Sequence, residues 1–144
     1  MQPQRVSDVK SHLQGLNTFS ELQEEYYAPL GGAADILAQR MINDQMKMTQ
    51  LRKFFGLLKK IQKTHLGHKD DAPLKQDELY RMVPLLSYSY GRKIVSREFF
   101  DVMTVSLQPE KMPHVKDFNK FINFMEAVVA YYKFHERNKG GERR

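Results

Sequence analysis

Basic side chains are concentrated in one short stretch of this chain. Between Gln45 and Lys69 there are seven lysines and arginines and no aspartate or glutamate, whereas all 144 residues together carry a formal net charge of only +6. The rest of the chain is therefore close to neutral. A positive charge localised in this way indicates a polyanionic partner, such as a nucleic-acid backbone.

The predicted nucleic-acid-binding residues lie in this stretch and directly after Gly91. They are Lys47, Arg52, Lys53, Lys59, Lys60, Lys63, Arg92 and Lys93. The chain has no RNP-like aromatic motif, GxxG loop or zinc knuckle, so we expect contacts with phosphate and sugar rather than readout of base sequence. The alternative for residues 52 to 63 is a basic helix face that is only solvated.

The sequence contains no convincing catalytic or metal-binding pattern. His65, His68, Asp70 and Asp71 are close in sequence, but their spacing fits no strong metal template, and neighbouring lysines would repel a cation. There is no cysteine, no Ser-His-Asp order and no phosphate-binding glycine loop. We therefore expect no catalytic residue, no metal and no cofactor. An RNase, the enzymatic alternative, would need a histidine or carboxylate cluster that the sequence does not show.

Apolar spacing predicts that helices display the basic residues. One face, at about 100° per residue, holds Leu51, Phe54, Phe55, Leu58 and Ile61, and the lysines and arginines gather on the other around Gly56. A hydroxyl at Thr49 is expected to cap this helix, and Ser96 a later one. Pro84 should kink a helix or begin a new one. The longest helix is expected from Asp117 to about Arg137.

These patterns predict an all-α fold, a compact bundle of about five or six helices with a loosely attached N-terminal segment. We expect residues 1–31 to form that segment, with short helices or partial flexibility, residues 32–137 to form the bundle, and residues 138–144 to be a flexible basic tail. No apolar run approaches the length of a membrane span or of a signal peptide. We therefore expect a soluble, cytoplasmic protein with no membrane partner.

The longest predicted helix has two apolar stripes. Phe118, Phe121, Ile122 and Met125 belong to the first, and the second consists of Phe124, Tyr131 and Phe134. A helix of this kind is either central in a bundle or shared with a partner. We expect the second stripe to be a partner interface, so that Phe124→Asp would weaken assembly and leave the fold intact.

Three sequence blocks suggest a family. They are TQLRKFFGLLKKIQ (residues 49–62), LLSYSYGR (residues 85–92) and FNKFINFMEAVVAYYKF (residues 118–134). In their order and spacing, from about Ala33 to Phe134, they resemble the small helical subunit of type III-A CRISPR effector complexes, the Csm small subunit. Arg52 and Lys53 match the family's threonine-anchored motif, and Arg92 ends a block similar to its Tyr-x-x-Gly-Arg. Tyr88 and Tyr90 stand where the family usually has small residues.

The resemblance implies a non-catalytic, RNA-binding structural subunit used in antiviral defence. It implies that copies join in a filament along guide RNA (crRNA) and target RNA, beside the large signalling subunit and the backbone subunit of the Csm complex. Whether the isolated chain is a monomer or a homodimer is left open. The alternative is a stand-alone helical adaptor that binds protein and whose basic face is solvated.

Overall fold

The computed structural model describes residues 2–142, with side chains through Arg137. Within that range it contains helices and no strand, which confirms the all-α prediction. The helices are α1 (Val6–Gly15), α2 (Glu24–Tyr27), α3 (Ala33–Asn43), α4 (Met48–Thr64), α5 (Asp77–Gly91), α6 (Arg97–Ser106) and α7 (Val115–Glu142), with 3₁₀ turns η1 (Phe19–Glu21) and η2 (Pro109–Lys111).

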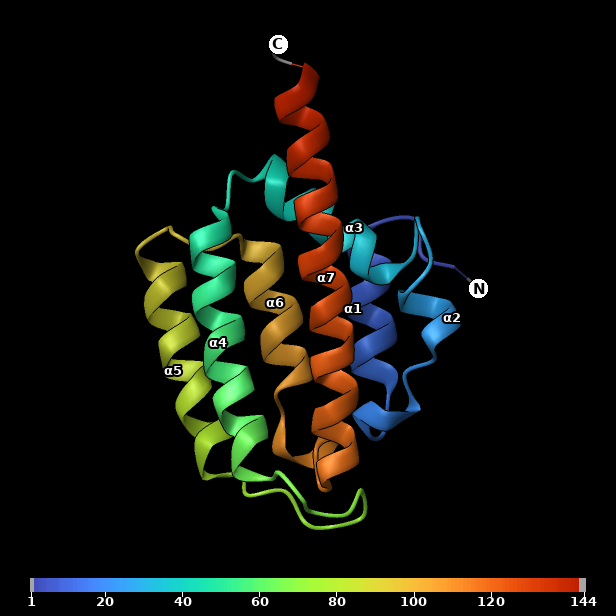
Figure 1. Cartoon of the computed structure of the whole chain (residues 1–144), viewed down its shortest axis with the longest axis vertical. Coiled ribbons are helices and arrows are strands. Elements are labelled where there is room, and N and C mark those ends of the chain that lie inside the picture. The colour runs from blue at the N-terminus through green and yellow to red at the C-terminus, as the bar shows by residue number, and fades with distance from the viewer. Residues whose placement is uncertain (1, 143–144) are drawn as a thin grey trace.

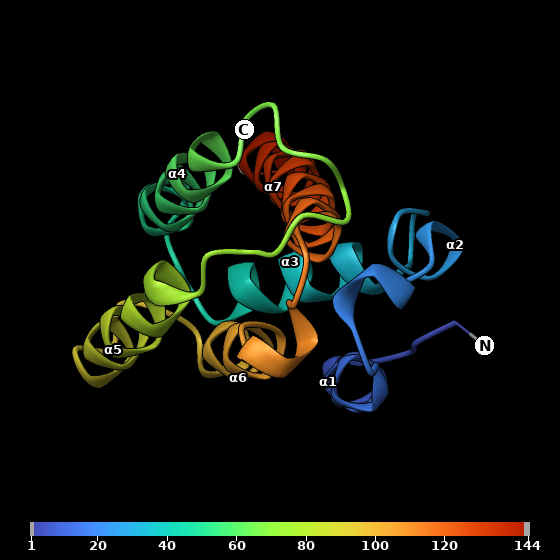
Figure 2. The same cartoon turned by 90° about the horizontal axis from the view of Figure 1, so that it is seen from below.

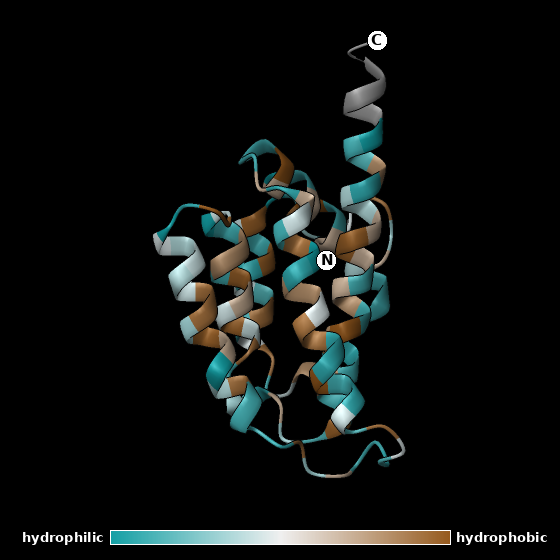
Figure 3. Cartoon of the chain, turned by 60° about the vertical axis from the view of Figure 1, so that its left-hand side comes forward, coloured by the Kyte–Doolittle hydropathy of each residue, from teal (hydrophilic) through white to brown (hydrophobic). Residues whose placement is uncertain are grey.

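The helices form a bundle in which α7 is the longest helix. Five helices, α1, α4, α5, α6 and α7, run roughly along one direction, and α3 lies across them near the end from which α7 projects (Figures 1 and 2). α7 packs against α3, η1 and α4, while α6 packs against α1, α3 and α5. Polar and apolar residues interleave along the helices (Figure 3), as expected for amphipathic helices that surround one core.

The N-terminal segment is part of the core, which differs from the expectation of a loose attachment. Leu13, Phe19 and Leu22 are fully buried. Lys10 of α1 forms ion pairs with Glu98 and Asp101 of α6, at 2.9 and 3.1 Å. Helix signals are weak in this part of the sequence because the burial comes from tertiary contacts with α6 and α7 rather than from a long periodic stripe.

Two of the expected caps can be compared with the structure. Ser96 caps α6 as predicted, because its hydroxyl accepts a hydrogen bond from the amide of Phe99. The cap predicted at Thr49 is wrong: α4 begins at Met48 and its N-cap is Lys47, whose side chain makes no capping hydrogen bond. The burial of Met48 explains the earlier start, since this side chain already belongs to the apolar face of α4.

The remaining differences concern helix continuity. Pro84 lies inside α5, which runs as one helix from Asp77 to Gly91. α7 begins two residues earlier than predicted and continues through Glu142, so the described backbone of residues 138–142 is helical. The flexibility of the tail stays a prediction, and its last two arginines, residues 143 and 144, lie outside the described residues.

Candidate nucleic-acid interface

The basic helix is α4, and its apolar face is buried as predicted except at Phe55, which is half-buried. Met48, Leu51, Phe54, Leu58 and Ile61 are buried at helical spacing against the core. The opposite face is open to solvent. Its exposed or half-buried basic side chains are Arg52, Lys53, Lys59, Lys60 and Lys63, and they surround Gly56, which is also exposed. The seventeen residues of α4 make a helix about 26 Å long.

One edge of this basic face borders α7. Lys59 lies 3.9 Å from Glu126 and 5.8 Å from the centre of the Phe55 ring. Farther along the same two helices, the Gln62 side chain donates a 3.1 Å hydrogen bond to Asn119. In these two contacts the residue number increases along α4 while it decreases along α7. The two helices are therefore antiparallel. Among the α4 cations, Lys59 is the least available to bind another anion, because its exposed ion pair with Glu126 partly neutralises its charge.

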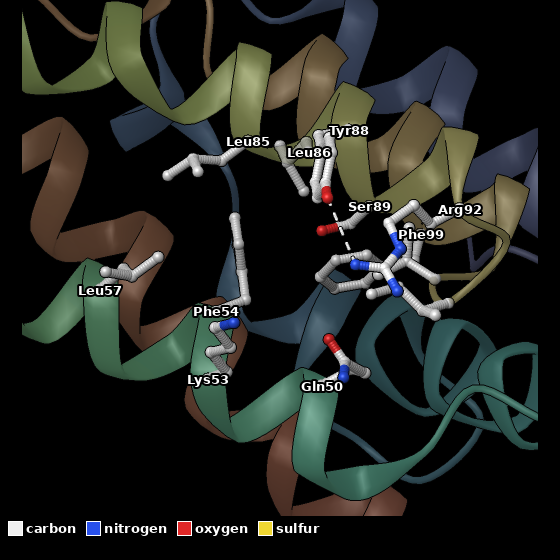
Figure 4. A pocket seen from close by; sticks show the side chains of 12 residues that line it. Gln50, Lys53, Phe54, Leu57, Leu85, Leu86, Tyr88, Ser89, Arg92 and Phe99 are labelled. Atoms are coloured by element: carbon white, nitrogen blue, oxygen red, sulfur yellow. Dashed lines mark hydrogen bonds between the residues drawn. The ribbon is translucent and has the colours of Figure 1, made fainter.

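The other edge of the basic face looks toward α5, and a pocket lies between the two helices. Lys53 of α4 and Arg92 at the C-terminal end of α5 line this pocket from opposite walls (Figure 4). The structure therefore brings together two predicted residues that are far apart in sequence. Arg92 is held in place by Tyr88, whose hydroxyl accepts a 3.2 Å hydrogen bond from the guanidinium group and whose ring lies 5.6 Å from it.

Lys47 and Lys93 meet at the N-terminal end of α4. Both line a small pocket that Gln45 and Asp44 also border. Asp44 is already engaged, because its carboxylate pairs with Arg40 and accepts a 2.6 Å hydrogen bond from Ser96. The exposed Lys47 and Lys93 thus extend the basic face beyond the first turn of α4. All eight predicted basic residues border one side of the molecule formed by α4 and the end of α5.

Sequence reasoning missed one basic residue at this surface. Lys133 is exposed and follows Glu126 by seven residues, two helical turns, on the same side of α7. Since α7 is antiparallel to α4, Lys133 comes level with Arg52. No sequence signal marks it, because its relevance depends on how the two helices are paired.

The predicted partner stripe is corrected at Phe124. This side chain is 0% exposed, and its ring packs against Phe19 and Tyr27 of the N-terminal segment. Phe124 therefore belongs to the core. Tyr131 is half-buried and its hydroxyl donates a hydrogen bond to the carbonyl of Ala28, whereas Phe134 is 48% exposed. Only Phe134 keeps the exposure that an interface with another molecule requires.

The histidines after α4 have a structural role. His65 is buried, and its two ring nitrogens contact the carbonyl of Ile61 and the amide of Lys75. Since the amide donates to Nε2, the neutral ring carries its proton on Nδ1, which lies 3.1 Å from the carbonyl oxygen of Ile61 and 3.0 Å from the hydroxyl of Thr64. His68 only packs edge-on against His65. Over residues 2–142 no group of three or more histidines and carboxylates is positioned to hold a metal ion.

A comparison with models of protein families identifies the family of this chain. The model described as Csm2 Type III-A matches residues 24–138. The chain belongs to the Csm2 type III-A family. This confirms the resemblance seen in the three sequence blocks and extends it to α2. Csm2 proteins are small structural subunits of the type III-A CRISPR effector complex, in which they assemble with other Csm subunits.

Two further comparisons add nothing to this assignment. No match was found among the curated proteins or the solved structures. In the part of the chain that the structure describes, no helix is both long enough and apolar enough to cross a membrane.

Proposed function

We propose that this Csm2-family subunit is non-catalytic and binds the sugar-phosphate backbone of guide RNA and target RNA through the basic face of α4 and its extensions at Lys47, Arg92, Lys93 and Lys133. The observation that carries the proposal is the clustering of these cations on one side of a folded bundle. A subunit that leaves sequence recognition to base pairing needs to hold backbone only.

The charge pattern of α4 supports a polyanionic partner over a merely solvated face. α4 has no acidic residue, and Lys59 and Lys63 are four residues apart on one face. Like charges at this spacing destabilise a helix by a few tenths of a kcal/mol per pair. Glu126 of α7 is the one carboxylate that approaches within 4 Å of the α4 cations among the described residues. An RNA backbone would relieve this repulsion.

The direct test is fluorescence anisotropy of a single-stranded RNA, titrated with the protein at several salt concentrations. The variant Arg52→Ala/Lys53→Ala/Lys60→Ala removes three exposed cations that make no ion pair within the described residues. Each lost phosphate contact reduces the slope of log affinity against log salt by roughly 0.7 for single strands. We expect weaker binding and a slope that is less steep by about 2.

A matched control removes three basic side chains elsewhere. In Lys75→Ala/Arg97→Ala/Lys116→Ala the exposed residues come from the loop after α4, from α6 and from the first turn of α7. Arg97 and Lys116 pair with Asp101 and Asp71 at 3.8 and 3.3 Å, but exposed pairs of this kind contribute little to stability. The net charge changes equally, so a difference between the triple variants reports position rather than total charge. Equal losses in both would contradict a defined interface. RNA binding that is absent in the wild type would favour the adaptor alternative, in which the basic face is only solvated.

Contact with neighbouring Csm subunits and with further copies of the chain completes the proposal. We place one such contact at Phe134, which is 48% exposed on α7. The end of α7 projects from the bundle (Figure 1), and exposed phenylalanines are enriched at protein interfaces. Phe134→Asp should reduce co-purification with the other subunits while the melting temperature stays within about 2 °C of wild type.

A further inference from the structure

The pocket between α4 and α5 is an apolar groove with a cationic rim. Its volume is about 200 Å³. The floor includes the buried side chains of Phe54, Leu86 and Phe99, and the half-exposed Leu85 stands on the α5 wall. α4 and α5 do not pack tightly against each other, because α5 packs against α6 instead. The groove therefore opens beside the basic face of α4.

The chemistry of the groove selects its ligand. Two of its lining residues are cationic, Lys53 and Arg92, and none is acidic. Gln50 and Ser89 add side chains that donate and accept hydrogen bonds. Apolar walls, a few polar groups and a cationic rim fit a flat, largely apolar ring that is attached to an anion. A nucleotide of an RNA strand has this combination.

The size of the groove and its tyrosine favour a base over a protein segment. An amphipathic helix needs anchors over two turns, and drug-sized ligand pockets measure about 300–1,000 Å³, so the groove suits a single ring. Tyr88 lines the groove and is 63% exposed, and the guanidinium group of Arg92 lies 5.6 Å from the centre of its ring. Proteins that bind single-stranded nucleic acid combine cations along the backbone with aromatic side chains on which bases stack.

We propose that the groove between α4 and α5 receives one unpaired base of the bound RNA, which stacks on Tyr88 while Lys53 and Arg92 hold the adjoining phosphates. The inference rests on the proposed function, because it adds a base contact to the same basic surface. It assigns Tyr88 a role that its neighbour Tyr90 lacks, since Tyr90 stacks on Phe100 of α6 with ring centres 4.8 Å apart.

The test uses anisotropy together with a single-stranded RNA that contains one 2-aminopurine. Tyr88→Ala should weaken binding about 5-fold or more, the range expected for loss of one base–aromatic stack, and should abolish quenching of 2-aminopurine. The salt slope should become less steep by no more than one phosphate contact, roughly 0.7, because Arg92 is the one groove cation that Tyr88 holds in place. Tyr88→Phe keeps the ring and should retain the quenching. Tyr80→Ala is the matched control: this tyrosine is 62% exposed on α5 but does not line the groove.

The outcomes separate the groove from the basic face. If Tyr88→Ala binds RNA like wild type while Arg52→Ala/Lys53→Ala/Lys60→Ala does not, the base site is wrong and the proposed function stands. If Tyr88→Ala binds RNA normally but no longer joins the other subunits, the groove holds protein instead and the inference is overturned. Equal losses in Tyr88→Ala and Tyr80→Ala would also overturn it. Failure of the wild type to bind RNA would overturn both proposals.

Discussion

His135 of α7 donates a hydrogen bond to the buried carboxylate of Asp35 in α3. The same carboxylate accepts hydrogen bonds from the amide of Gly31 at 2.7 Å and from Gln39 at 2.9 Å. Asp35 thereby fastens the turn before α3 to α7 at His135. The link holds in place the helix end that carries Phe134.

This carboxylate should make stability depend on acid pH. Burial raises the pKa of Asp35, but hydrogen bonds from Gln39, Gly31 and His135, with the charge of His135, outweigh it and leave the pKa below its ordinary value. A lowered pKa in the folded state stabilises the fold above the unfolded-state pKa of about 3.9, and this contribution is lost as pH falls through the folded value. We expect urea midpoints of the wild type to decline below about pH 4.

The variant Asp35→Asn isolates the effect. It should lower the free energy of unfolding at pH 7 by about 1–3 kcal/mol and make stability less dependent on pH below 4, because the titrating group is gone. Asp70→Asn is the control, since Asp70 is exposed and its side chain makes no hydrogen bond or ion pair within the described residues. An acid decline in Asp35→Asn as steep as in wild type would show that other carboxylates cause it.

Phe124 provides a second prediction, which replaces the one made from sequence. Because its ring is fully buried against Phe19 and Tyr27, Phe124→Ala should destabilise the fold by about 3–5 kcal/mol, and Phe124→Asp should unfold it by burying a charge. Thermal melts followed by circular dichroism measure both. Phe134→Asp, at an exposed site on the same helix, should melt like wild type. If Phe124→Asp melted cooperatively at the wild-type temperature, Phe124 would not be a core residue, and the original prediction of a partner interface would stand.

The error at Phe124 shows what the sequence alone could decide. Periodicity along one helix placed Leu51, Phe54 and Leu58 inside and the α4 cations outside, because a single helix face determines both. It also showed that α7 has two apolar faces. It could not show what covers the second face, since Phe19 and Tyr27 lie about a hundred residues away in segments with weak helix signals. The pairing of Lys53 with Arg92 across a groove likewise depends on tertiary packing.

Gly56 supports a third prediction, at the centre of the basic face. A Cβ at this position would have nothing within 4 Å, and the residue lies in the interior of α4. Gly56→Ala should therefore stabilise the fold by about 0.5–1 kcal/mol and raise the melting temperature by a few degrees. Gly32→Ala is the opposite case, since its Cβ would meet the carbonyl oxygens of Pro29 and Tyr26 at 2.9 Å. We expect that variant to melt below wild type.

His65 supports the last prediction. Its imidazole accepts a 3.1 Å hydrogen bond from the amide of Lys75, and so ties the end of α4 to the loop that leads to α5. His65→Ala leaves that amide without its acceptor and should lower the free energy of unfolding by about 1–3 kcal/mol. Hydrogen exchange at Lys75 should also become faster than in wild type. His68→Ala should change neither quantity, because His68 is exposed and only touches the edge of the His65 ring. If Lys75 stayed protected in His65→Ala, the loop would be held by its backbone hydrogen bonds to residues 113–116 alone.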